Sequence, residues 1–176
     1  MVRQIQSTRT ILRRFNLSDF KNMRMLESDA EIMKFTTYRV PQTLEQTQNR
    51  LILLIEKESS FAPLGVWAVE HKENNKFIGW FMLRATDLEF PELGFMLVKE
   101  FWGHGFAIEI AKALIEYAFN DLKLAGISAA TDVNNVISEH ILTSLGFQFV
   151  KIISIAEKDE GSGLPLKIFN CFRRSL

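Results

Sequence analysis

Cysteine and histidine are scarce in this chain of 176 residues, which has one cysteine, Cys171, and three histidines. A single cysteine excludes a disulfide within the chain, and this fits a reducing compartment. Because thiol and imidazole groups are the ligands of structural zinc sites, their scarcity argues against such a site. We therefore expect the protein to need no metal.

The chain also lacks a net charge, a long apolar run and an apolar beginning. Lys and Arg together number 21, as do Asp and Glu, so the formal net charge is zero. This balance gives no support to a nucleic-acid or membrane partner. The longest apolar run, Leu51–Ile55, is far shorter than the roughly 20 residues of a membrane span. Residues 1–15 are polar and basic, so we expect no signal peptide and a cytoplasmic protein.

No repeat, no low-complexity segment and no linker rich in Pro, Gly or Ser divides the sequence. The length suits one domain with a hydrophobic core of its own. A hydrophobic content of 47% with 24% charged residues is ordinary for a globular protein. We therefore expect residues 1–176 to form a single domain.

The first half of the chain changes from helical spacing to the two-residue alternation of strands. Ser18 or Asp19 can cap a first helix, and Thr43-Leu44-Glu45-Gln46 is the capping-box pattern that opens a second. Beyond position 65 the pattern changes to that of two strands around a turn. The expected elements are a strand at 10–15, helices at 18–27 and 43–57, and strands at 66–69 and 77–83 that flank the turn at 73–76.

The second half of the chain alternates strands with helices. Asn134 or Asn135 can cap its second helix, which Gly146 ends. The expected elements are a strand at 92–98, a helix at 105–122, a strand at 127–132, a helix at 135–145, and a hairpin of 147–156 and 166–172 across a polar loop at 157–165. The order β-α-α-β-β-β-α-β-α-β-β predicts an α/β protein with a mixed sheet (α+β) and helices packed on it. Strands 92–98 and 127–132 should be parallel, joined by a right-handed crossover.

A glycine-rich loop, Trp102–Ala107, lies between the strand at 92–98 and the helix that follows. Glycines let the backbone approach a phosphate, and the free N–H groups at a helix start can bind it. A dinucleotide-binding loop would need Gly or Ala at position 108, which is Ile, and the Gly-Lys-Ser/Thr of a nucleoside triphosphate site is absent. Spacing alone leaves open a phosphate cradle and a tight turn with no ligand.

Three segments resemble the GNAT N-acetyltransferase superfamily. The run Phe101–Glu109 resembles its acetyl-coenzyme A loop, and Trp102 at the head of that loop is typical of the RimJ/RimL-like branch. Asn135-Val136-Ile137-Ser138, followed by Leu145-Gly146-Phe147, looks like a helix of that branch, and Thr8–Arg13 is similar to its opening strand. The resemblance spans about residues 7–150, whereas Phe169–Phe172 lacks the Asp and Tyr that the branch often carries there.

This resemblance implies a GNAT fold of about seven strands flanked by four helices, in which the parallel fourth and fifth strands, 92–98 and 127–132, splay apart. It implies acetyl-coenzyme A as co-substrate, with the pyrophosphate on the glycine loop and the pantetheine arm in the opening between the two strands. His104 is expected to contribute its backbone, with an exposed side chain. The implied cofactor-binding residues are Met96, Leu97, Val98, Trp102, Gly103, His104, Gly105, Phe106, Ala107 and Asn135.

The resemblance also implies two catalytic residues. Glu92 is the candidate general base, acting directly or through water, although it could equally be a solvated strand carboxylate or the partner of an arginine. Ser138 is the candidate hydrogen-bond donor to the leaving sulfur, although it could be an ordinary residue of the first helical turn. Many GNAT enzymes have a Tyr seven residues after the Asn, and Leu142 stands there in this chain.

The expected function is N-acetyltransferase activity by direct transfer to a primary amine, either a protein N-terminus or a small molecule. The acceptor pocket is expected around residues 33–41 and the loop 157–165, and a homodimer is possible. The missing Tyr keeps open a non-catalytic acyl-coenzyme A sensor on the same fold. A dinucleotide-binding protein is a third interpretation.

Overall fold

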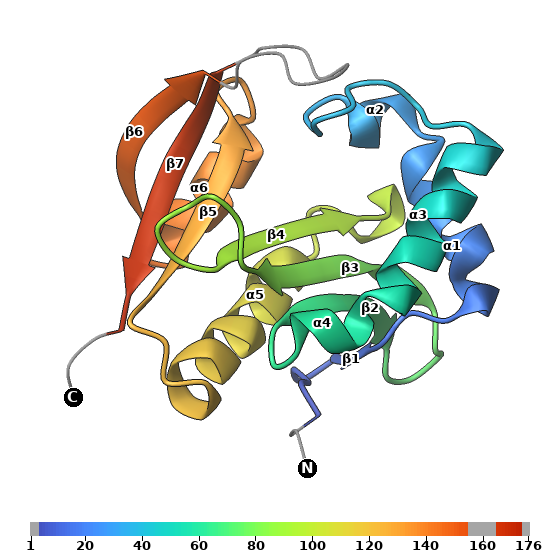
Figure 1. The fold of residues 1–176 in the computed structure, drawn as a ribbon, viewed down its shortest axis with the longest axis horizontal. Coiled ribbons are helices and arrows are strands. Elements are labelled where there is room, and N and C mark those ends of the chain that lie inside the picture. Colours follow the sequence, from blue (N-terminus) through green and yellow to red (C-terminus); the bar gives the residue numbers. More distant parts are fainter. Residues whose placement is uncertain (1–3, 155–164, 174–176) are drawn as a thin grey trace.

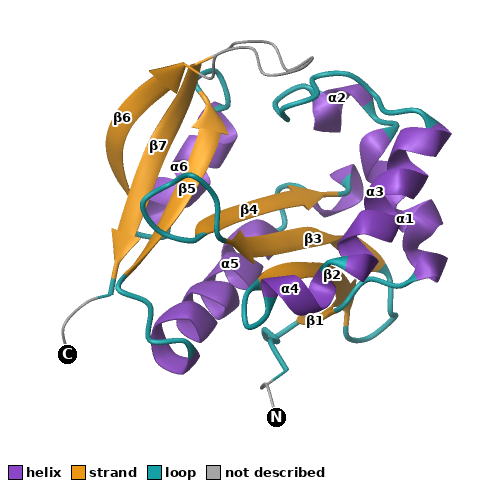
Figure 2. Cartoon of the chain, in the orientation of Figure 1, coloured by secondary structure: helices purple, strands orange, loops and turns teal. Residues whose placement is uncertain are grey.

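A seven-stranded mixed sheet runs through the molecule, with helices on both of its faces (Figures 1 and 2). The computed structural model describes residues 4–154 and 165–173. The spatial order of the strands is β1-β2-β3-β4-β5-β7-β6; β4 and β5 are parallel, and the other neighbours are antiparallel. The strands are β1 (Thr10–Arg13), β2 (Gly65–His71), β3 (Phe77–Arg84), β4 (Glu92–Leu97), β5 (Gly126–Asp132), β6 (Gln148–Ser154) and β7 (Pro165–Phe172).

The four expected helices are confirmed, and the described residues form two more of a single turn each. The longer helices are α1 (Phe20–Glu27), α3 (Leu44–Glu56), α5 (Phe106–Glu116) and α6 (Val136–Ser144); the short ones are α2 (Ala30–Met33) and α4 (Glu58–Phe61). The capping box at the start of α3 is confirmed, because Thr43 accepts the N–H of Gln46 and the Gln46 side chain accepts the N–H of Thr43. A π-helical turn, Tyr117–Asp121, extends α5 almost to the expected end.

The C-terminal hairpin of β6 and β7 is confirmed as far as the structure describes it. Residues 155 and 156 of the expected strand, and residues 157–164 of the loop expected to border the acceptor, lie outside the described residues. Within the described residues, none of the helices combines the length and the apolar character that a bilayer crossing would require.

Each face of the sheet has its own hydrophobic cluster. The cluster on the α5/α6 face includes Leu93 and Leu97 of β4, packed with Ile110 and Leu114 of α5. The cluster on the α1/α3 face includes Leu26 and Leu51, with the side chains of Met96 and Val98 packed against it. Because side chains of a strand point alternately to opposite faces, the odd-numbered residues of β4 face α5, and the even-numbered residues, Glu92 included, face the α1/α3 side.

The expected splaying of the two parallel strands is confirmed. β4 and β5 are in register at one pair of residues, Glu92 and Ser128, beside which the Ser128 N–H donates to the Pro91 carbonyl at 3.0 Å. Beyond this point β5 leaves β4 and pairs with β7 along its whole length (Figure 1). The sheet is therefore open between the carboxyl ends of β4 and β5 and closed at their amino ends.

Buried polar side chains hold the closed end of this opening. The Ser128 hydroxyl donates to Asn170 Oδ1 at 2.8 Å and accepts the N–H of Phe90 at 3.2 Å. The Asn170 amide in turn donates to Glu89 at 3.2 Å. Residues 89–90, which precede β4, are thus hydrogen-bonded to side chains of β5 and β7. These bonds lie where the backbone pairing between β4 and β5 ends.

Candidate active site

The glycine loop adopts a conformation that only glycine accommodates without strain. Gly103 and Gly105 have φ values of +75° and +78°, in the left-handed region. Gly105 is the N-cap of α5, and no side chain caps this helix end. The first helical hydrogen bond is donated by the Glu109 N–H to the Gly105 carbonyl at 3.1 Å. The N–H groups of residues 106–108 therefore stand at an uncapped helix start, which is suited to an anion.

Side chains on both sides of the loop hold it in place. Trp102 Nε1 donates to the Leu97 carbonyl at 2.9 Å, which ties the head of the loop to the end of β4. Arg9 Nη2 donates to the His104 carbonyl at 3.1 Å, and its guanidinium lies 3.9 Å from the centre of the Phe106 ring. His104 itself is exposed, as expected. Arg9 thus brings a positive charge next to the helix start.

Glu109 fixes Arg9 in that position. Its carboxylate accepts Arg9 Nε at 2.6 Å, the Arg9 backbone N–H at 2.8 Å and the Ser7 hydroxyl at 2.6 Å. Burial alone would raise the pKa of Glu109, but the hydrogen bonds from Ser7 and Arg9 outweigh it and lower the pKa below its usual value. The carboxylate is therefore ionised at neutral pH. Sequence reasoning did not find Arg9 or Glu109, although both lie inside segments that it singled out.

The direction of the β4 backbone groups follows from two hydrogen bonds. The Pro91 carbonyl accepts the N–H of Ser128 of β5, whereas the Val98 N–H donates to the carbonyl of Ile78 in β3 at 2.9 Å. Since backbone groups of a strand alternate in direction, those of residues 93, 95 and 97 point towards the opening. The Val98 carbonyl also accepts the N–H of Phe101 at 3.0 Å. Both backbone groups of Val98 are thus used within the protein, which corrects the expectation that they are free for a cofactor. Because the direction alternates along the strand, the backbone groups of Met96 point to β3.

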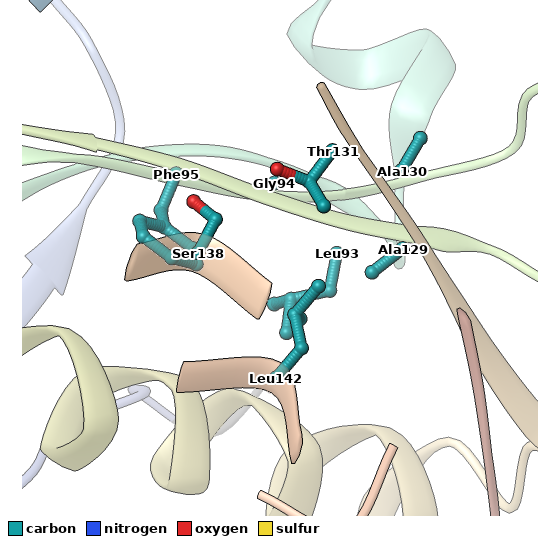
Figure 3. A pocket seen from close by; sticks show the side chains of 8 residues that line it. All are labelled: Leu93, Gly94, Phe95, Ala129, Ala130, Thr131, Ser138 and Leu142. Carbon is teal, nitrogen blue, oxygen red and sulfur yellow. The ribbon is translucent and has the colours of Figure 1, made fainter. Parts of the chain in front are cut away.

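A cavity of about 50 Å³ lies between the diverging strands. Figure 3 shows its lining, in which the Ser138 hydroxyl and the Leu142 side chain come from α6. The remaining lining residues come from β4 and β5 and are Leu93, Gly94, Phe95, Ala129, Ala130 and Thr131. Of the two residues expected to be catalytic, Ser138 lines this cavity.

Asn135 caps α6, as expected: its Oδ1 accepts the Ser138 N–H at 3.1 Å. The turn before it is held by the buried Asp132, whose carboxylate accepts the Asn134 N–H at 2.8 Å and forms an ion pair with Arg39. Burial would raise the pKa of Asp132, but its hydrogen bonds with Arg39 and Asn134 lower it below the usual value. Arg39 belongs to the segment 33–41 that was expected to border the acceptor, so this segment reaches the open end of β5.

Glu92 lies on the other face of the sheet and does not line the cavity. Glu92 is directly opposite Arg84 of β3 in the antiparallel ladder. Because directly opposed residues of such a pair lie on the same face, the two side chains share the α1/α3 face. Burial raises the pKa of Glu92 above its ordinary value, although a hydrogen bond with Thr86 and the positive charge of Arg84 act in the opposite direction. A carboxylate with a raised pKa and a serine hydroxyl thus flank the opening from opposite faces of the sheet.

The raised pKa of Glu92 predicts a pH-dependent gain in stability for Glu92→Gln. Because the pKa of Glu92 is higher in the folded than in the unfolded protein, folding favours its protonated form. The contribution of Glu92 to the free energy of unfolding is therefore fully present below the unfolded-state pKa, about 4. It is lost as the pH rises through the folded-state pKa. Glutamine resembles the protonated acid at every pH. We expect the variant to have a higher Tm than the wild type at pH 7, and the difference to disappear as the pH falls below about 4. Thermal unfolding by circular dichroism across this range measures it, and an equal or lower Tm at pH 7 would contradict the expectation.

Comparisons with known proteins agree on one family. The family model of the acetyltransferase (GNAT) domain matches residues 9–148. An uncharacterized N-acetyltransferase from Bacillus licheniformis is 28% identical over 172 residues, which cover 97% of this chain and 96% of that protein. The crystal structure of a GNAT-family acetyltransferase from Bacillus anthracis superposes with a TM-score of 0.83 at 20% identity, over 97% of this chain and 98% of the other. The ribosomal α-N-protein acetyltransferase RimL, in complex with coenzyme A, superposes with a TM-score of 0.79 at 16% identity, over 97% and 98% of the two chains.

Proposed function

Because the chain belongs to the GNAT acetyltransferase family, which uses acetyl-coenzyme A, we propose that it transfers the acetyl group directly to a primary amine. The observation that carries this proposal is the open sheet, which has an uncapped helix start at its wide end and a cavity between its strands. In one extended molecule, a phosphate group would fit the helix start and a thioester would fit the cavity between the strands. We also propose that the chain belongs to the RimJ/RimL-like branch, which the Trp102 motif and the likeness to RimL support.

The cofactor contacts that we propose follow the backbone. The pyrophosphate accepts hydrogen bonds from the N–H groups of Gly103–Ala107, beside the guanidinium of Arg9, which is itself paired with Glu109. The pantetheine arm lies along the opening, next to Met96 and Leu97 and within reach of Asn135. The backbone N–H groups of Phe95 and Leu97 face this opening and replace those first expected from Met96 and Val98.

In the reaction that we propose, Glu92 accepts a proton from the amine on the α1/α3 face of the sheet. The amine nitrogen then attacks the thioester carbonyl carbon, and backbone N–H groups of β4 stabilise the oxyanion. When the intermediate collapses, the carbon–sulfur bond breaks and the thiolate leaves towards the α5/α6 face, where the Ser138 hydroxyl donates to it. The two groups on opposite faces suit this sequence, because the nucleophile enters and the leaving group departs on different sides of the carbonyl.

Release of free thiol from acetyl-coenzyme A tests the proposal. The purified protein would be incubated with acetyl-coenzyme A and a panel of primary amines, which includes polyamines, amino acids and short peptides with free N-termini. We expect amine-dependent thiol release with at least one class and an acetylated product by mass spectrometry. Tight binding of acetyl-coenzyme A without turnover of any amine would instead favour the sensor function. The buried Leu142, which stands where many GNAT enzymes have a Tyr, is the observation that supports this alternative.

Replacing Ser138 tests the proposed leaving-group contact. We expect Ser138→Ala to lower kcat about tenfold, since a hydrogen bond to a charged group contributes about 1.5 kcal/mol or more. Coenzyme A affinity should remain unchanged. Steady-state kinetics with a saturating amine measure the effect. Ser144→Ala is the matched control, because Ser144 lies in the last turn of the same helix, where its hydroxyl donates to the His140 carbonyl at 2.8 Å. Equal kcat values for the two variants would exclude Ser138 from the chemical step.

A further inference from the structure

Among the described residues, the half-buried guanidinium of Arg84 forms neither a hydrogen bond nor an ion pair. The six other arginines within residues 4–154 each form a side-chain hydrogen bond or an ion pair. They are Arg9, Arg13, Arg14, Arg24, Arg39 and Arg50. The Nε of Arg84 is buried and has no hydrogen-bond partner among the described residues. A buried, unpaired guanidinium nitrogen is costly unless a ligand pairs with it.

The Phe61 ring of α4 holds Arg84 without using its hydrogen-bonding groups. The guanidinium lies over this ring, 4.7 Å from its centre. A cation–π contact uses the positive charge of the guanidinium and none of its five N–H donors. The contact with Phe61 therefore leaves the donors of Arg84 free for another group. This is the arrangement in which an arginine binds a planar anion by two parallel hydrogen bonds.

Arg84 and the proposed general base lie side by side on one face. Arg84 ends β3 and Glu92 begins β4, and the two residues are directly opposite in the ladder. They form no ion pair among the described contacts, although they are close enough for the charge of Arg84 to act on Glu92. A free cation and a carboxylate with a raised pKa are thus neighbours on the face that the proposed amine must approach.

We propose that Arg84 binds a carboxylate of the acceptor, and that the acceptors are primary amines with a carboxylate a few bonds from the nitrogen. This inference rests on the proposed function, since it places the amine at Glu92. An ammonium group and a carboxylate on one small molecule, or at the start of one peptide, complement the neighbouring pair Glu92 and Arg84 in charge. The same chemistry occurs in a free amino acid and in a peptide whose first residue is acidic.

Acceptor binding would also change the charge around the base. The carboxylate of the acceptor compensates the positive charge of Arg84, which otherwise favours the ionised form of Glu92. Glu92 then becomes a stronger base once this acceptor is bound. An amine without the carboxylate leaves Arg84 uncompensated and meets a weaker base. The arrangement therefore favours carboxylate-bearing amines both in binding and in proton transfer.

The test compares matched acceptors and two arginine variants. Each acceptor with a carboxylate is paired with its amide: a free amino acid with its carboxamide, and a peptide beginning with Asp with one beginning with Asn. We expect the wild type to prefer the acids by at least about tenfold in kcat/KM. Arg84→Met should remove this preference by raising KM for the acids, whereas turnover of the amides should rise rather than fall, because the charge of Arg84 no longer weakens Glu92 as a base. Arg84→Lys should restore part of it.

Arg14→Met is the control, because Arg14 is also half-buried and its guanidinium also lies over an aromatic ring, that of Trp67, but it pairs with Glu58 of helix α4 at 3.1 Å. The acid with the higher kcat/KM, the free amino acid or the peptide that begins with Asp, shows whether the natural acceptor is a small molecule or a peptide. Equal losses for acids and amides in Arg84→Met, or a wild type without preference for acids, would overturn the inference while leaving the acetyltransferase function intact.

If no amine is acetylated, the proposed function fails, and calorimetry then tests Arg84 separately. Glutamate and a peptide beginning with Asp serve as the probes. Binding to the wild type that Arg84→Met abolishes supports a carboxylate site, and the absence of binding to the wild type overturns it.

Discussion

The Gly105→Val variant is expected to lose coenzyme A binding, with an affinity at least about a hundredfold lower, since several charge-assisted hydrogen bonds are lost together. Gly105 has a φ of +78°, which a β-branched residue adopts only with strain. A Cβ at this position would face open space, where the nearest atom of the chain is Arg9 Nη2 at 3.8 Å. The valine methyl groups would therefore occupy the volume that the pyrophosphate needs, and the strained backbone would turn its N–H groups away.

Calorimetric titration with coenzyme A measures this effect, and Gly146→Val is its control. Gly146 has a similar φ of +86°, and a Cβ there would also meet nothing within 4 Å. It follows the end of α6, whereas Gly105 precedes the start of α5. Both variants should lose comparable stability through backbone strain, and only Gly105→Val should lose the cofactor. If it binds normally, the pyrophosphate lies elsewhere.

The Glu92→Gln variant is expected to turn over about a hundredfold more slowly at neutral pH, the lower end of the range for loss of a general base. Its affinity for acetyl-coenzyme A should remain nearly unchanged, because the Glu92 side chain faces the α1/α3 side of the sheet and does not line the cavity. Since burial raises the pKa of Glu92, kcat/KM of the wild type should fall on the acid side at a pH above the ordinary carboxyl value. The variant should lack this acid limb.

Initial rates between about pH 5 and pH 9, together with cofactor titrations, measure both expectations. Glu89→Gln is the matched control, because Glu89 precedes Glu92 by three residues, is exposed, and accepts a hydrogen bond from Asn170 that glutamine can also accept. An unchanged rate in Glu92→Gln would remove Glu92 as the base. A loss of cofactor affinity as large as the loss of rate would give it a binding role instead.

Local patterns predicted the helices and strands because their signals are short-range. The capping box at Thr43, the Asn135 cap and the two-residue alternation each lie within a few residues of sequence. The one-turn helices α2 and α4 were missed, since four residues are too few to show a helical period. The open sheet was expected from the family resemblance alone, because nothing within 92–98 or 127–132 indicates that two parallel strands will separate.

The features that sequence reasoning missed depend on contacts between distant residues. Arg9 and Glu109 are a hundred residues apart in sequence, so their ion pair beside the glycine loop has no local signal. Which β4 backbone groups face the opening depends on the register with β3, and an offset of one residue reverses it. The missing hydrogen-bond partner of Arg84 becomes visible only once the partners of the other arginines within residues 4–154 are known.

Because β4 and β5 are in register at a single pair of residues, we expect the proposed co-substrate to act also as a structural component of the protein. Elsewhere in the sheet, a ladder of backbone hydrogen bonds ties each strand to its neighbour; here Ser128 and its partners tie one end only. An extended amide-bearing arm in the opening would supply polar partners for Phe95 and Leu97 and would act as a substitute strand. The arm would thus add backbone pairing between two halves of the sheet that a shared hydrophobic cluster already joins. Amide hydrogen exchange in β4 and β5 would follow cofactor occupancy more closely than global stability.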